Sequence, residues 1–145
     1  MLCLVSTPRR HLKWAHGMHT KFAYAVPCLR PFTVEESSLL NYVVKHEHPA
    51  RMDELEGLMV IGRCGCEKCP TILLGRGPKV LPTSPCYDLT HIVYLGMNQQ
   101  GVMVAVALLE RGGQFSELEA WSFAGDAVLS WPRPEDLEST AMFLH

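Results

Sequence analysis

VMVAVALLERGGQFSELEAWSF, residues 102–123, is the stretch that decides the fold of this 145-residue chain. Two apolar or alternating runs, 102–110 and 115–123, flank the sequence RGGQ at 111–114. Two such runs around a glycine-containing turn are typical of a β-hairpin. In the second run Glu117, Glu119 and Trp121 share one parity, while Leu118 and Ala120 share the other. Neither parity is purely apolar, so the sequence predicts the hairpin without selecting the face that meets the core.

Three further strands are predicted before the hairpin, at 58–63, 71–74 and 89–95. A cysteine-rich turn separates the first two, and a loop rich in Gly and Pro follows at 75–85. The predicted strands lie too close in sequence for parallel crossovers, which need about a dozen residues each. We therefore expect a mainly antiparallel sheet of four or five strands.

Helices are predicted before and after these strands. Thr33 and Glu36 form a T-x-x-E capping box, which favours a helix start, and the segment is expected to end at His48, before Pro49. A second short helix is expected at 50–56 and a short C-terminal helix at 134–138. The predicted fold class is thus α+β, with two N-terminal helices packed on the four- or five-stranded sheet and a short C-terminal helix.

Composition and charge narrow the functional classes. With 48% hydrophobic and 19% charged residues and a net charge of -2, the chain has the balance of one ordinary soluble domain. A pI near 6.4 argues against nucleic-acid binding, and no apolar run approaches the roughly 20 residues that span a bilayer. Residues 1–30 carry five basic residues and no acid. We therefore expect a basic N-terminal extension at 1–30 and a single α+β domain at 31–145.

The cysteine-rich turn CGCEKC, residues 64–69, is the strongest candidate for chemistry. Cys64, Cys66 and Cys69 place three thiols within six residues, and sulfurs that converge on one zinc ion lie about 2.3 Å from it. A tetrahedral site needs a fourth ligand, for which Cys86, His91 or a second chain is the candidate. The same pattern fits free or buried thiols, and also a disulfide or redox pair. The sequence leaves these three interpretations open.

Motifs for catalysis are weaker. The chain has no G-x-G-x-x-G, Walker A or G-x-S-x-G sequence. Glu117 and Glu119 share one strand face at a Cα spacing of roughly 6.7 Å, which allows a paired acid and base, although exposed strand carboxylates are the commoner case. No catalytic residue is therefore assigned from the sequence.

Four segments together resemble a family of small uncharacterised bacterial proteins: PFTVEESSLLNYVV (31–44), GRCGCEKCPTI (62–72), FSELEAWSFAGD (115–126) and WPRPEDLE (131–138). The resemblance covers about residues 31–138 and implies an α+β fold and a bacterial cytoplasm, but no known activity. Family members have a tighter C-G-C-x-P-like turn, into which this chain inserts Glu67 and Lys68.

Two functions follow as expectations. The first is a non-catalytic binding or interaction module, accessory or immunity-like, whose acidic 31–145 region suits a basic protein partner. The alternative is a metal-dependent or thiol-based enzyme, or a zinc-binding protein, centred on Cys64, Cys66 and Cys69.

Overall fold

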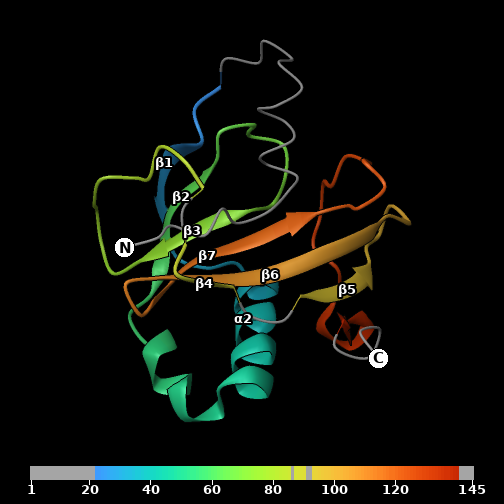
Figure 1. Cartoon of the computed structure of the whole chain (residues 1–145), viewed down its shortest axis with the longest axis horizontal. Helices are drawn as coiled ribbons and strands as arrows, with labels where there is room; N and C mark the ends of the chain where they lie inside the picture. The colour runs from blue at the N-terminus through green and yellow to red at the C-terminus, as the bar shows by residue number, and fades with distance from the viewer. Residues whose placement is uncertain (1–21, 86, 91–92, 141–145) are drawn as a thin grey trace.

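The computed structural model describes residues 22–85, 87–90 and 93–140, which form an antiparallel sheet with helices on one face (Figure 1). Eight strands make up the sheet: β1 (Ala25–Arg30), β2 (Met59–Cys64), β3 (Ile72–Gly75), β4 (Leu89–Thr90), β5 (Tyr94–Met97), β6 (Met103–Arg111), β7 (Gln114–Trp121) and β8 (Glu138–Ser139). Their spatial order is β1-β2-β3-β7-β6-β5-β8, and β4 pairs with β6. The long β6–β7 hairpin is therefore central, and β1 and β8 lie at the two edges.

The predicted arrangement of two N-terminal helices on four or five strands is wrong, although α+β describes the fold broadly. The second predicted helix is a 3-10 helix, η1 (Pro49–Leu55), and the C-terminal one is a three-residue 3-10 turn, η2 (Pro134–Asp136). The sheet has more strands than expected for three reasons. First, the strand expected at 89–95 is divided into two strands, β4 and β5. Second, the unpredicted strand β8 pairs with β5.

The third reason is strand β1, which comes from the predicted N-terminal extension. It pairs antiparallel with β2, and its register shifts between Pro27 and Arg30. Proline cannot donate a ladder hydrogen bond and is therefore confined to edge strands or bulges, which is the position that β1 occupies. The rest of the predicted extension, residues 1–21, lies outside the described residues.

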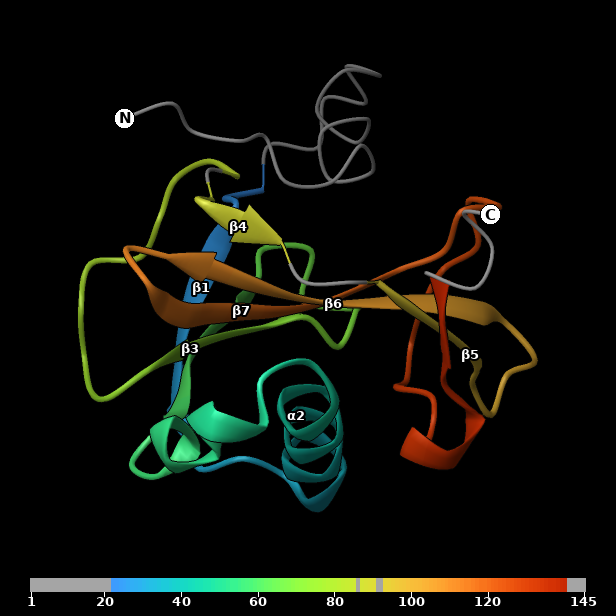
Figure 2. The ribbon, with the colours of Figure 1, turned by 60° about the horizontal axis from the view of Figure 1, so that its bottom comes forward.

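Helix α2 (Val34–Glu47), the longest helix of the described residues, begins as the capping box predicts. The Glu36 amide donates to the Thr33 hydroxyl at 3.1 Å, and the Thr33 amide donates to the Glu36 carboxylate at 2.9 Å. The apolar stripe of α2, with Leu39, Val43 and Val44, is fully buried. Figure 2 shows α2 and η1 together below the sheet, with β4 on its opposite side.

Strand β6 is buried on both faces, which explains its nearly continuous apolar sequence. Val104, Val106 and Leu108 belong to the core between α2 and the sheet. Ala105, Ala107 and Leu109 belong to a second cluster, with Tyr87 and Trp121, on the opposite face of the sheet. In β7, Leu118 and Ala120 face the α2 core. Glu117, Glu119 and Trp121 therefore point to the second face, opposite Leu109, Ala107 and Ala105 of β6.

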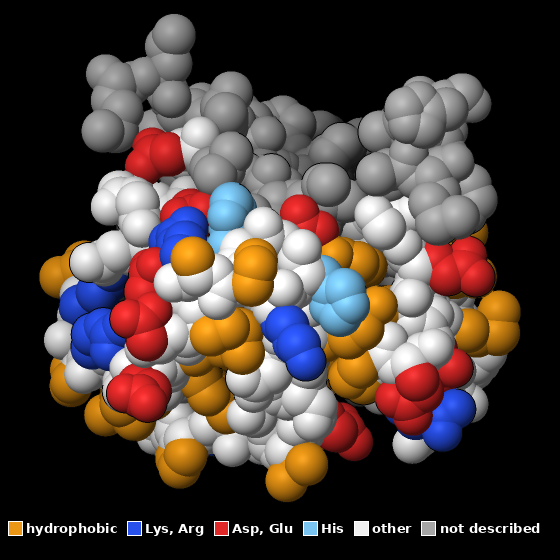
Figure 3. Space-filling model, turned by 90° about the horizontal axis from the view of Figure 1, so that it is seen from below, with side chains coloured by type: hydrophobic (Ala, Val, Ile, Leu, Met, Phe, Trp, Pro, Cys, Tyr) orange, Lys and Arg blue, Asp and Glu red, His pale blue; other side chains and the backbone are white. Residues whose placement is uncertain are grey.

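The surface that carries the helices is mixed in character. Figure 3 shows acidic and basic side chains of this face interspersed with hydrophobic ones, so this view contains no basic patch of the kind that nucleic-acid binding requires. Among the described residues, no helix combines the length and the apolar character needed to cross a bilayer.

Candidate metal centre

The predicted cysteine turn connects β2 to β3 and is closed by its own backbone. Cys64 ends β2, and its amide donates to the Thr71 carbonyl at 3.2 Å, while the Glu67 amide donates to the Cys64 carbonyl at 3.0 Å. Glu67 has a φ of 57°, in the left-handed region that non-glycine residues rarely occupy. Glu67 and Lys68 therefore form a tight turn that brings the chain back toward Cys66.

Gly65 fixes this turn against the start of β1. The Gly65 amide donates to the Tyr24 carbonyl at 3.1 Å, and Ala25 lies opposite Cys64 in the β1–β2 register. A Cβ atom at position 65 would lie 1.5 Å from the backbone oxygen of Ala23. Only glycine allows this approach. The turn is therefore held by β2 and β3, which it connects, and by the backbone of residues 23–24 before β1.

The three cysteine side chains converge. The sulfurs of Cys64, Cys66 and Cys69 all lie within 4.8 Å of one another, and the sulfur atoms of Cys66 and Cys69 are 3.3 Å apart. Around a tetrahedral zinc ion with Zn–S distances of about 2.3 Å, neighbouring sulfurs lie about 3.8 Å apart. Small side-chain adjustments would therefore place three sulfurs around one ion.

Backbone amides prepare Cys66 to carry negative charge. The amides of Lys68 and Cys69 donate to the Cys66 sulfur at 3.5 and 3.3 Å. Hydrogen bonding with the side chains of Cys64 and Cys69 lowers the pKa of the Cys66 thiol far below its usual range, and the two backbone amides lower it further. Together they outweigh burial, which raises the pKa. The thiolate, which is the form that binds metal, is thus favoured at Cys66.

The fourth-ligand candidates from the sequence, Cys86 and His91, lie outside the described residues. The described part of the chain supplies three ligands from the cluster, of which Cys64 is buried and Cys66 and Cys69 are partly exposed. An ion could therefore enter from the side of Cys66 and Cys69. Cys28 stands apart from this cluster, in β1, where it packs against the core beneath α2.

A second group of titratable residues was not predicted to be buried. Glu117 and Glu119 have no exposed surface, although the sequence favoured exposed carboxylates. The Tyr24 hydroxyl donates to Glu117 Oε2 at 3.1 Å, and the hydroxyls of Tyr24 and Tyr87 are 2.7 Å apart. Burial, and then the nearby charge of Glu119, raise the pKa of Glu117 well above its ordinary value.

The sequence contained one signal for this burial. Trp121 shares the parity of the two glutamates, and β6, the partner of β7, is apolar at every position from Val104 to Leu109. An apolar partner strand indicates burial on both faces. Tyr24 contacts both groups: its carbonyl accepts a hydrogen bond from Gly65 of the cysteine turn, and its hydroxyl donates to Glu117. Comparisons of the chain with protein-family models, with curated proteins and with solved structures found no match.

Proposed function

We propose that this protein binds one zinc ion through the thiolates of Cys64, Cys66 and Cys69. The observation that carries the proposal is the arrangement of the turn around Cys66, whose sulfur accepts two backbone amide hydrogen bonds and lies among the other two thiols. These amides stabilise a thiolate before any ion arrives, so less free energy is needed to deprotonate the site.

The donor set favours zinc over other common ions. Three sulfur donors are soft ligands, which suit Zn²⁺, Cu⁺ or iron–sulfur clusters and are poorly matched to Mg²⁺ or Ca²⁺. Iron–sulfur clusters usually use four cysteines, whereas three cysteines plus one other ligand is a common zinc set. Zinc also imposes no geometric preference of its own, so it tolerates a turn as compact as 64–69.

The identity of the fourth ligand separates two roles for the ion. If Cys86 or His91 completes the tetrahedron, the site is closed and structural, in agreement with a non-catalytic binding module in a bacterial cytoplasm. If water or another small molecule completes it, the site is open, as in the alternative of a metal-dependent enzyme. We propose the closed, structural role, because the turn ties together β2, β3 and the segment before β1.

The proposal is tested by metal analysis of the purified full chain after extensive dialysis. We expect one equivalent of zinc per chain, and cobalt substitution should give the thiolate-to-metal charge-transfer absorption that reports sulfur ligands. Cys66→Ser and Cys69→Ser should lose the ion, while Cys28→Ser, a cysteine outside the cluster, should retain it. Zinc well below one equivalent, with all thiols titrating as free, would contradict the proposal.

Two more variants identify the fourth ligand. Cys86→Ser and His91→Ala should differ, with one of them losing affinity as Cys66→Ser does. Full zinc occupancy in both variants would show that neither residue is the ligand, and the oligomeric state of the zinc-loaded protein would then separate a ligand supplied by a second chain from the open, enzymatic alternative.

A further inference from the structure

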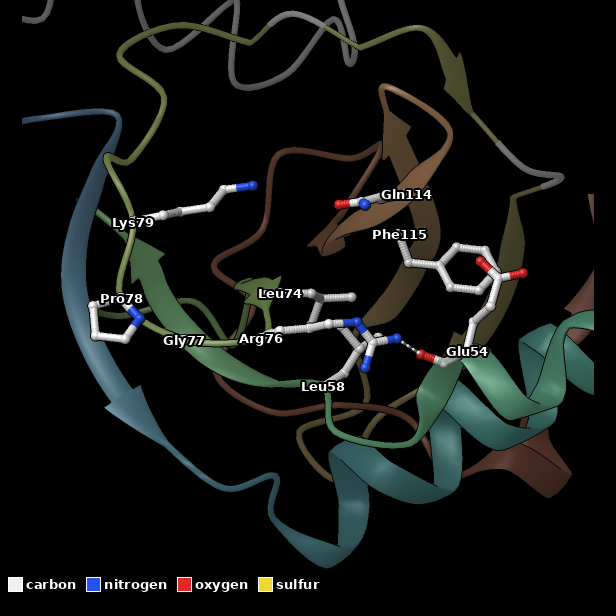
Figure 4. Close-up of a pocket in the computed structure, with 10 residues that line it drawn as sticks. Glu54, Leu58, Leu74, Arg76, Gly77, Pro78, Lys79, Gln114 and Phe115 are labelled. Carbon is white, nitrogen blue, oxygen red and sulfur yellow. Dashed lines mark hydrogen bonds between the residues drawn. The ribbon is translucent and has the colours of Figure 1, made fainter.

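A cavity of about 410 Å³ lies at the end of β3 that is remote from the cysteine turn (Figure 4). It opens between the loop 75–79, η1 and the turn of the β6–β7 hairpin. Leu58, Leu74 and Phe115 give it an apolar wall, and Leu74 and Phe115 are themselves buried. The volume falls in the range of small-molecule sites, which combine such walls with a few polar groups in fixed positions.

Arg76 is one of these polar groups, and its guanidinium is held in place. It donates to the backbone carbonyl oxygen of Glu54 at 2.8 Å and to that of Glu56. Gly57 makes room for it, because a Cβ atom at position 57 would lie 2.8 Å from Arg76 Nη1, and the φ of +76° at Gly57 suits glycine. Both hydrogen-bond partners are neutral carbonyl groups, so these bonds orient the guanidinium without neutralising its charge.

The other charges around the cavity leave an excess of positive charge. Lys79 is exposed on the loop, and its side chain extends over the open space in Figure 4. The carboxylate on the lining, Glu54, already accepts two hydrogen bonds from Arg51, at 2.6 and 2.9 Å. Arg51 also pairs with the buried Glu110 and lies over the Phe115 ring, so it stays beside Glu54. Arg76 and Lys79 therefore form the cationic side of the cavity.

We propose that this cavity binds a small organic anion, a compound with an apolar body and a terminal carboxylate or phosphate group. The apolar body packs against Leu58, Leu74 and Phe115, and the anionic group lies between Arg76 and Lys79, where charge-assisted hydrogen bonds favour it. The site is independent of the zinc centre, since the two lie at opposite ends of β3.

The experiment is a titration of the ¹⁵N-labelled full chain, followed by amide chemical shifts at constant ionic strength. The probes are phenylacetate and phenyl phosphate, with benzyl alcohol as the uncharged comparison and inorganic phosphate as the anion without an apolar body. We expect at least one of the two organic anions to cause saturable shifts at residues 75–77 and at Gln114. Its binding should be tighter than that of benzyl alcohol and of inorganic phosphate. A preference between phenylacetate and phenyl phosphate would identify the anionic group.

Variants distinguish binding of the organic anion in this cavity from nonspecific attraction of an anion to any positive side chain. Lys79→Gln should weaken binding of the organic anion about tenfold, the size expected for one lost charge-assisted contact. Lys45→Gln, which removes a positive charge on α2 away from the cavity, should leave binding unchanged. Arg76→Lys keeps the charge but loses the forked contacts, and should bind more weakly than the unaltered protein. Equal binding of benzyl alcohol, shifts scattered over many lysines, an unaffected Lys79→Gln variant or the absence of saturation would each overturn the proposal.

Discussion

At the scale of single residues, Glu117 is the side chain whose chemistry departs furthest from expectation. A fully buried carboxyl group beside a second one favours the protonated form, because burial penalises charge and Glu119 adds repulsion. Tyr24 provides a hydrogen bond to Glu117, so the group is satisfied as an acceptor. Burial and the neighbouring Glu119 therefore shift the proton equilibrium of Glu117 in the folded state toward its neutral form.

The raised pKa of Glu117 predicts how the stability of the protein depends on pH. Because the folded pKa of Glu117 is raised, its contribution is fully present below the unfolded value of about 4.5 and is lost as pH rises through the folded value. The contribution of Glu117 to the free energy of unfolding should thus fall with rising pH, by at most about 1.4 kcal/mol per pH unit for this one group. Glu117→Gln should flatten this dependence in urea titrations, whereas Glu138→Gln, on an exposed residue, should not. If the free energy of unfolding varied with pH in the same way for the unaltered protein and for Glu117→Gln, the raised pKa of Glu117 would be contradicted.

Gly65 is the second residue with a sharp requirement. Gly65→Ala places a Cβ atom against the Ala23 carbonyl, so the start of β1 must separate from the cysteine turn. We expect a loss of about 2–3 kcal/mol in the free energy of unfolding, together with weaker zinc binding. Gly101→Ala is the matched control, since Gly101 has a φ of +73° and open space around it, and should cost only about 1–2 kcal/mol. Equal losses in the two variants would show that the contact with Ala23 is unimportant.

At the scale of elements, an ion pair joins the edge strand β1 to α2. Arg30 donates two hydrogen bonds to Glu36, at 2.7 and 2.9 Å, and Glu36 is only 4% exposed. Burial alone would raise the pKa of Glu36, but the hydrogen bonds from Arg30 and from the capping box outweigh it and lower the pKa. The edge strand is thus fastened to the helix that covers the same sheet.

Removing Arg30 should therefore leave a buried carboxylate with fewer partners. We expect Arg30→Gln to lower the free energy of unfolding by about 1–2 kcal/mol at neutral pH, a reduced value because Arg30 is partly exposed. The loss should diminish below about pH 4.5, where the unfolded carboxyl group becomes protonated and the lowered pKa of Glu36 no longer contributes fully. Arg133→Gln, which breaks a surface ion pair with Asp136, is the control and should leave stability nearly unchanged at both pH values. Chemical denaturation at pH 4 and pH 7 checks both expectations.

The elements that could be predicted from the sequence are those formed by local interactions. The capping box at Thr33 and Glu36 predicted the start of α2, and the turn at 111–114 predicted the β6–β7 hairpin. The structure confirms both predictions. Strands β1 and β8 could not be predicted, because they are short and depend on partners distant in sequence, β2 and β5. The apolar partner strand β6 indicated that Glu117 is buried, but its contacts with Tyr24 and Tyr87 involve distant parts of the chain and could not be predicted.

The cysteine centre was predictable for a related reason. Its three sulfurs lie within six residues, so their convergence is a property of one turn. What the sequence could not show is the positive φ of Glu67 and the two amides that point to the Cys66 sulfur. Glu67 and Lys68 are the residues that build this turn.

At the scale of the whole molecule, the proposed zinc centre lies where segments distant in sequence meet at one end of the sheet. The turn joins β2 to β3, contacts the backbone before β1, and is separated by β3 from the organic-anion cavity. The helix α2 packs against the same sheet through its own apolar stripe. Loss of the ion should therefore loosen one end of the sheet and leave the α2 core largely intact.

Removal of zinc tests this distribution of stability directly. Binding free energy at a structural site contributes to folding, so a chelator at neutral pH, or acidification that protonates the thiolates, should lower the melting temperature. Hydrogen–deuterium exchange should then increase at the ends of β1, β2 and β3 nearest the turn. It should increase much less in α2 and in the centre of the β6–β7 hairpin, because buried apolar side chains on both faces of β6 stabilise these two elements. Cys66→Ser should reproduce the exchange pattern without chelator, and adding a chelator to that variant should have no further effect. A uniform rise in exchange over the whole sheet would instead place the ion's contribution in the global unfolding equilibrium, and an unchanged pattern would mean that the turn is stable without metal.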